Sequence, residues 1–229
     1  MKTFEVRRPD IAGKAAERKA QALEEKPREK DGVIAALRID PNKVEAYYNQ
    51  GNAYDDKGLY DQAIADYTAA LRIDPDYDKA YCNRGNAYDD KGDYDRAIAD
   101  YTAALRIDPD YAAAYYNRGS AYYNQKDYDH AIADYTAALR IDPDLAAAYY
   151  NRGNAYFTKG DYDRAIADYT AALRLDPDLA AAYYNRGNAY YDKKDYDRAI
   201  ADYTAALRIN PNYSNARIWL EKARQARGY

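Results

Sequence analysis

Residues that could carry out catalysis are scarce in this chain of 229 residues. It has one His (His130), one Cys (Cys82) and two Ser, Ser120 and Ser214. Covalent catalysis needs a nucleophile, a base beside it and a group that orients the base. Because these four residues cannot supply that set, we expect no catalytic residues and no enzymatic activity.

The acidic run at residues 89–95, DDKGDYD, comes nearest to a metal-binding pattern. A calcium-binding EF-hand loop alternates its ligands and ends on a Glu, and this run has neither that spacing nor that Glu. We interpret it as solvated charge at a helix end, and we expect no metal and no cofactor.

Asparagine, by contrast, recurs at two positions with a spacing of 34 residues. The first position holds Asn49, Asn83, Asn117, Asn151 and Asn185. The second holds Asn52, Asn86, Asn154 and Asn188, with Ser120 in the third place. A carboxamide both donates and accepts hydrogen bonds, so a ladder of Asn could hold the main chain of an extended peptide. The alternative is that these Asn bridge neighbouring structural units or face water.

Residues beside the Asn positions would decide which peptide binds. Aromatic side chains give rigid contact area at low entropic cost. The aromatic set is Tyr48, Tyr116, Tyr150, Tyr184, Tyr123, Phe157 and Tyr191. Asp55 and Asp89 stand at the place that Tyr123 takes in the third unit. We therefore expect a groove that runs from acidic to aromatic, and a protein or peptide partner with Lys or Arg toward one end and apolar or aromatic groups toward the other.

These side chains must be positioned by helices. The sequence AIADYTAALR begins at Ala63 and returns four times at intervals of 34 residues, which defines five units at 44–77, 78–111, 112–145, 146–179 and 180–213. In each unit, small and aromatic residues recur every three or four positions in two stretches, as in two amphipathic helices. A turn with Gly58 joins the two, and Pro75 follows the second. Helices this short are marginal alone, so the hairpins must stack.

Two units depart from the turn pattern. Lys126 and Lys194 replace the turn Gly of the third and fifth units. We expect each Lys to adopt a left-handed backbone conformation, at a cost of about 1 kcal/mol.

The pattern Tyr47-x2-Gln50-Gly51-x2-Tyr54, followed by Ala63-x3-Tyr67 and Pro75, resembles the tetratricopeptide repeat. The five units cover residues 44–213. The resemblance implies an all-α, right-handed superhelical α-solenoid of antiparallel helical hairpins. It also implies that the first helices line a concave groove for partner peptides, and that the Asn at these places contact the peptide backbone.

Arginine replaces the Leu that the family usually places before the Gly, at Arg84, Arg118, Arg152 and Arg186, whereas the first unit has Gln50. Every second helix carries an Asp directly before its Tyr. An unpaired buried charge is very costly, so we predict that Arg84 pairs with Asp100 and that each later unit repeats this pair. The alternative is that the Arg side chains extend to solvent.

Some relatives hold a terminal carboxylate with Lys and Arg on their inner helices. Here the relevant places carry Tyr48, Ala113 and Asn117, and only Lys79 is basic. We therefore do not expect recognition of an acidic C-terminus at these places.

Two segments flank the five units. Residues 1–43 form an atypical N-terminal segment, in which 33–41 matches the end of a unit and predicts a degenerate hairpin with its first helix at 11–26. An arm that docks on another molecule is the alternative for this segment. Residues 214–229 predict a C-terminal capping helix, with Ile218, Trp219 and Leu220 as its apolar residues.

Charge is unevenly distributed along the chain. Residues 1–43 and 214–229 each carry a net charge of +3, and residues 44–213 carry −10. An acidic body repels phosphate backbones, so we expect no nucleic-acid partner. No apolar run approaches the roughly 18 residues of a membrane span, so we expect no membrane partner. Residues 1–12 lack the apolar stretch of a signal peptide, which favours a cytoplasmic protein, although a signal peptide already removed would leave the same sequence.

Together these patterns predict a non-enzymatic scaffold that binds an extended peptide or protein segment in its concave groove. One alternative is a structural module that self-assembles into a head-to-tail or swapped homo-oligomer, because the end of one array resembles the interior of another. Another is an engineered or excised repeat array without a dedicated partner.

Overall fold

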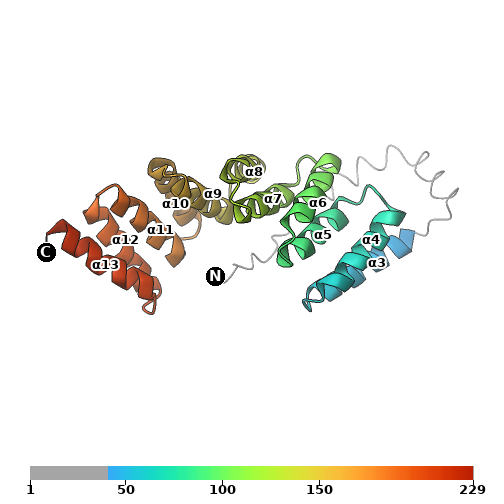
Figure 1. Ribbon diagram of the computed structural model, residues 1–229, viewed down its shortest axis with the longest axis horizontal. Helices are drawn as coiled ribbons and strands as arrows, with labels where there is room; N and C mark the ends of the chain where they lie inside the picture. Colours follow the sequence, from blue (N-terminus) through green and yellow to red (C-terminus); the bar gives the residue numbers. More distant parts are fainter. Residues whose placement is uncertain (1–40, 229) are drawn as a thin grey trace. The chain divides into compact units, whose positions relative to one another are not determined.

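A computed structural model describes residues 41–228, and this part of the chain contains α-helices and no strands. Consecutive helices pack as antiparallel hairpins, which confirms the predicted helical solenoid (Figure 1). By their packing the helices fall into two units, the first ending at Asp76 and the second starting at Tyr77. The predictions for residues 1–40 lie outside the described residues. None of the helices between residues 41 and 228 combines the length and the apolar character that a membrane span needs.

The first unit contributes one described hairpin, α3 (Pro41–Asp55) and α4 (Tyr60–Ile73). On α4, Ala63, Tyr67, Ala70 and Leu71 are buried, at the three- and four-residue spacing that the sequence predicts.

The second unit is a stack of four hairpins and a final helix. Its first helices are α5 (Asp78–Asp90), α7 (Ala112–Asn124), α9 (Ala146–Thr158) and α11 (Ala180–Asp192). Its second helices are α6 (Tyr94–Ile107), α8 (Tyr128–Ile141), α10 (Tyr162–Leu175) and α12 (Tyr196–Ile209), and α13 (Ser214–Arg227) follows. Each second helix packs on the first helix of its own hairpin and on the helix that comes next. Successive first helices also touch, so they form one continuous wall.

A close Tyr–Gly contact lies at the centre of each hairpin. Tyr101 of α6 is fully buried, and its ring leaves no room at Gly85 of α5, where an added Cβ would lie 2.7 Å from the Cε1 atom of Tyr101. The same pair of residues recurs in every hairpin of the second unit. The Gly of the repeat is therefore required by packing, because only a residue without a Cβ lets the two helices approach this closely.

The hairpin turns take a left-handed backbone conformation. Gly92 and Gly160 have φ of 77° and 80°, and Lys126 and Lys194 have φ of 66° and 62° at the equivalent turns. The prediction that both Lys adopt this conformation is therefore confirmed.

Candidate partner-binding surface

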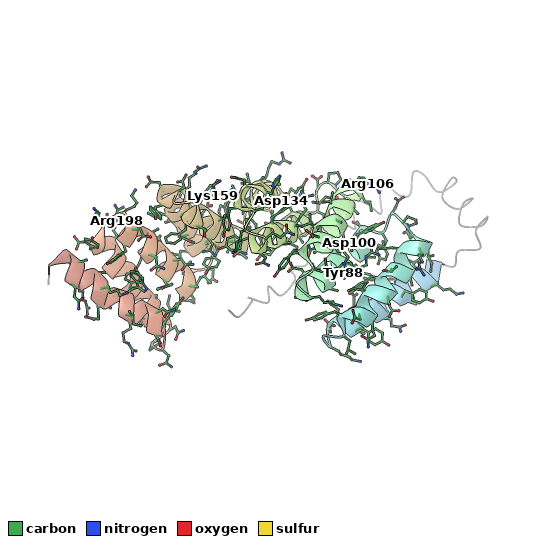
Figure 2. The ribbon with its side chains drawn as sticks, in the orientation of Figure 1. Tyr88, Asp100, Arg106, Asp134, Lys159 and Arg198 are labelled. Carbon is green, nitrogen blue, oxygen red and sulfur yellow. The ribbon has the colours of Figure 1, made fainter. Side chains whose placement is uncertain are left out.

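The predicted Arg–Asp pairs hold the hairpins of the second unit together. Arg84 of α5 donates two hydrogen bonds of 2.7 Å to Asp100 of α6, where the Arg side chain is 17% exposed and the Asp side chain 9%. The equivalent pairs are Arg118 with Asp134, Arg152 with Asp168 and Arg186 with Asp202. Asp100 and Asp134 are labelled on α6 and α8 in Figure 2. This prediction is confirmed.

Burial and the hydrogen bonds within each pair shift the pKa values of the paired Arg and Asp. The hydrogen bonds that Arg118 donates to Asp134 raise the pKa of the Arg118 guanidinium, so this Arg stays charged. Burial raises the pKa of Asp202, and the hydrogen bonds from Arg186 oppose that shift. Arg118 also donates a 2.9 Å hydrogen bond to Thr102 of the preceding hairpin. One guanidinium therefore joins two hairpins, a structural role.

In the first unit this arrangement is incomplete, because Gln50 takes the place of the Arg. The Oδ2 atom of Asp66 is shielded from solvent and has no hydrogen-bond partner, and burial raises the pKa of this carboxyl group.

The first Asn position does not present a ladder of free amides. Asn117 donates from Nδ2 to Asn86 at 2.8 Å, and Asn151 donates to the hydroxyl of Tyr116 at 2.9 Å. Asn185 donates to both Tyr150 and Asn154, at 3.0 and 2.9 Å. All these acceptors lie on the preceding first helix. In these three residues at least one amide N–H therefore bridges neighbouring hairpins of the stack, as in the alternative interpretation.

The other two residues of the first Asn position, Asn49 and Asn83, differ in exposure from these three. Asn49 is exposed on α3 of the first unit, and Asn83 is buried, with an exposure of 4%. Asn83 is therefore poorly placed to reach a partner.

The second Asn position is arranged differently. The buried Tyr hydroxyl of each hairpin donates to its Oδ1 atom, at 2.9 Å from Tyr101 to Asn86, from Tyr169 to Asn154 and from Tyr203 to Asn188. In the first unit Tyr67 donates to Asn52 at 2.8 Å. On α7 of the second unit, Ser120 replaces the Asn and accepts from Tyr135 at 3.2 Å. Because Oδ1 accepts these bonds, the amide orientation is set, and Nδ2 must lie on the opposite side. Within residues 41–228, the Nδ2 atoms of Asn86, Asn154 and Asn188 have no hydrogen-bond acceptor in the stack.

The predicted aromatic residues are half-buried. The rings of Tyr116, Tyr150 and Tyr184 lean on the buried Tyr of their own hairpins, with ring centroids 5.8 to 6.0 Å apart, as Tyr48 does on Tyr67 in the first unit. Burial raises the pKa of Tyr116 and Tyr150, so both hydroxyls stay protonated and available to the Asn donors of the next hairpin.

A second aromatic row lies near the C-terminal ends of the first helices. Tyr123, Phe157 and Tyr191 are half-buried and each packs on the first residue of the following helix, with centroids 5.3 to 5.5 Å apart. Rings held in this way offer partly exposed faces without further loss of side-chain entropy.

Asp89 takes the place of that ring on α5, and Asp55 takes it on α3. The Oδ1 atom of Asp89 is shielded from solvent without a hydrogen-bond partner. Burial raises the pKa of Asp89 to about 6, with a further contribution from the neighbouring charge of Asp90. Asp89 is thus an ill-solvated carboxylate at neutral pH, and a cation beside it would stabilise its charged form.

Cys82, His130 and the hollows of the described surface do not contribute to this row of polar and aromatic side chains. Cys82 is buried, at 2% exposure. His130 is exposed, stacks on Tyr122 and contacts Asp127, as Arg does in other units. Two shallow polar hollows lie at the hairpin turns, one of them lined by Lys91, Asp95 and Gln125.

The sequence predicts α13 as a capping helix, and in the structure α13 also occupies the place of a further first helix. It packs on α12 and touches α11, as α11 packs on α10 and touches α9. Ser214 follows Ala180 by 34 residues, and Gly228, with φ of 99°, follows Lys194 by 34. This spacing was the signal by which α13 could have been recognised as part of the wall.

Comparisons with known proteins agree with this geometry. Tetratricopeptide repeat family models match residues 82–146, 150–214 and 35–65, and a TPR repeat model matches 51–92. Among curated protein sequences, none matches this chain.

Solved structures show the same fold. A crystal structure of MamA is 30% identical, with a TM-score of 0.68 over 72% of this chain and 96% of that one. YrrB, titled a TPR protein with an unusual peptide-binding site, is 24% identical, with a TM-score of 0.70 over 85% and 98% of the two chains. The first TPR of Spaghetti (RPAP3) bound to the HSP90 peptide SRMEEVD is 27% identical, with a TM-score of 0.52 over 53% and 97%.

Stacked hairpins whose first helices form a continuous wall define a helical-repeat scaffold for protein–protein interaction. The chain belongs to the tetratricopeptide repeat family.

Proposed function

We propose that the second unit binds an extended segment of a partner protein along the wall of first helices, and that it does so without catalysis. The amide nitrogens of Asn86, Asn154 and Asn188 donate to main-chain carbonyl groups of the partner. The observation that carries this proposal is the orientation of these amides, whose Oδ1 atoms accept from buried Tyr hydroxyls while Nδ2 has no acceptor in the stack. The family resemblance favours the same concave side.

The side chains beside these amides decide which segment fits. Tyr123, Phe157 and Tyr191 offer ring faces to apolar or aromatic groups of the partner. Asp89, on α5, offers a half-buried carboxylate to a Lys or Arg, because an ion pair would offset the cost of its partial burial. The partner therefore carries a basic residue where it meets α5 and apolar groups where it crosses α7, α9 and α11.

A displayed library of extended peptides, panned against the full chain, tests this proposal. The informative variant is the triple substitution Asn86→Ser, Asn154→Ser and Asn188→Ser. It copies Ser120, which accepts the buried Tyr hydroxyl at 3.2 Å and has no amide to donate. We expect it to weaken the binding of selected peptides by about 1–3 kcal/mol, roughly 5- to 150-fold. Unchanged affinity in a triple variant that melts like the wild type would contradict the proposal.

Self-assembly through the C-terminal end is the competing function, and α13 gives it little support. A further second helix would have to pack where the other first helices present Gly and Tyr. At these places α13 has Glu221 and Arg224, which are exposed and pair with each other at 2.8 Å. Light scattering over a concentration series separates the two functions, since stacking through this end requires a mass that rises with concentration.

A further inference from the structure

The last helix of the second unit extends the binding wall and changes its charge. With the repeat spacing of 34 residues, Trp219 takes the place of Asn185, and Lys222 takes the place of Asn188. Lys222 is therefore a cation at a position that holds a neutral side chain in all the other units.

The aromatic row continues onto this helix. The ring of Trp219 meets the ring of Tyr191 edge-on, with centroids 5.1 Å apart and an interplanar angle of 79°. The ammonium group of Lys222 lies 4.3 Å from the centroid of the Trp219 ring. This cation–π contact restrains a side chain that would otherwise be mobile, so the charge is held beside the end of the aromatic row.

The neighbouring charges leave Lys222 available to a partner. Glu221, the one acidic residue of α13, is engaged by Arg224 at 2.8 Å. Arg227 is engaged by Asp197 at 2.7 Å. In the part of the chain that the structure describes, no carboxylate forms an ion pair with Lys222. Ile218, 53% exposed one residue before Trp219, adds an apolar surface.

We propose that Trp219 and Lys222 form an end subsite of the wall, which takes a carboxylate of the partner segment. The inference rests on the proposed function and adds to it a second charged end. Asp89 on α5 and Lys222 on α13 carry opposite charges at the two ends of the aromatic row. An extended segment with a basic residue toward one end and an acidic group toward the other therefore binds in one direction only.

The carboxylate can come from an acidic side chain or from a free C-terminus, and both have the same chemistry. The simpler interpretation of α13 is a solubility cap on which Lys222 serves only to cover the Trp219 ring. The two interpretations differ in whether Lys222 distinguishes peptides with a carboxylate from those without one.

The probe is a set of synthetic peptides that a displayed library selects on the full chain. Each peptide is made with its acidic residues kept or changed to the amides, and with a free or amidated C-terminus. Binding is measured for the wild type, Lys222→Gln and Lys222→Glu. Arg208→Gln is the matched control, because Arg208 is an exposed cation in the last turn of α12, outside the wall of first helices.

We expect Lys222→Gln to weaken the binding of carboxylate-bearing peptides roughly tenfold and to leave their neutral counterparts unchanged. Lys222→Glu should shift the preference toward Lys or Arg at the same peptide position. The peptide chemistry that loses affinity identifies the source, side chain or terminus. The inference is overturned if the carboxylate preference survives Lys222→Gln, or if Arg208→Gln reduces it equally. It is also overturned if the selected peptides bind without any preference for a carboxylate. In each of these cases the proposed function still stands. If no peptide binds the wild type, both fall.

Discussion

The amide nitrogen of Asn151 lies 2.9 Å from the phenol oxygen of Tyr116, across the junction of two hairpins. This bond joins residues 35 positions apart, on the adjacent first helices α9 and α7. Together with the bonds that Asn117 donates to Asn86 and Asn185 donates to Tyr150, it makes the first Asn position a series of links between hairpins. In a repeat stack, stability depends on such links between neighbours.

Replacement of Asn117, Asn151 and Asn185 by Ala should therefore reduce stability rather than affinity. Each substitution removes a hydrogen bond between hairpins worth about 0.5–1.5 kcal/mol. We expect a lower urea midpoint for the triple variant, and peptide affinity close to wild type under conditions where it is folded. A variant that unfolds like the wild type but no longer binds peptide would restore the role that the sequence first suggested for these residues.

Gln50→Arg should stabilise the first unit. The new Arg would meet Asp66, whose Oδ2 atom is shielded without a hydrogen-bond partner, in the geometry that Arg84 and Asp100 show. We expect a gain of about 1 kcal/mol in the free energy of unfolding. The gain should vanish when Asp66→Asn is present, and a double-mutant cycle without coupling would contradict the explanation.

Lys126→Gly should stabilise the third hairpin. Its φ of 66° is unfavourable for a residue with a Cβ and acceptable for Gly. The relief of strain stabilises the folded state, and the greater entropy of Gly in the unfolded chain offsets part of this effect. We expect a net gain of about 0.5–1 kcal/mol in the free energy of unfolding, measured by thermal or chemical unfolding. The reverse change, Gly160→Lys, is the control and should cost a similar amount. Equal stability of all three proteins would show that the turns carry no strain.

Asp89 should make stability depend on pH. Its pKa is raised from 3.8 to about 6 in the folded chain, so the folded state binds the proton more tightly than the unfolded state does. Ionisation of this group therefore lowers the free energy of unfolding as pH rises from about 4 to about 6, and its effect is constant above pH 6. We expect Asp89→Asn to be more stable than the wild type at pH 7 by about 1–3 kcal/mol, and to lose this advantage near pH 4.

Unfolding of both proteins at pH 4, 5, 6 and 7 measures that difference, since the other carboxylates cancel in the comparison. If a partner cation pairs with Asp89, the same substitution should also weaken the binding of peptides that carry a Lys or Arg. A stability difference that does not change with pH would show that Asp89 is well solvated.

Contacts within a hairpin could be predicted from the sequence, because they depend only on helical spacing and charge. Arg84 and Asp100 each fall on the facing sides of two adjoining helices, and an unpaired charge there would be too costly. The left-handed turns at Lys126 and Lys194 follow from the Gly that other units place there.

Contacts between hairpins could not be predicted in the same way. Whether Asn185 reaches Tyr150 or a partner depends on how closely two first helices approach, and the repeat spacing does not specify that distance. The amide orientation of Asn154 depends on the hydroxyl of a Tyr on another helix. The role of α13 was missed because its residues differ from the repeat, although its spacing does not.

The side-chain amide signals of Asn86, Asn154 and Asn188 test the central claim most directly. In a titration of the isotope-labelled full chain with a library-selected peptide, NMR follows each Nδ2 group separately. We predict saturable shifts of these three signals, since their amides donate to the partner, and smaller shifts for Asn117, Asn151 and Asn185. Saturable binding that leaves the first three signals unmoved would contradict the claim that these amides hold the partner segment.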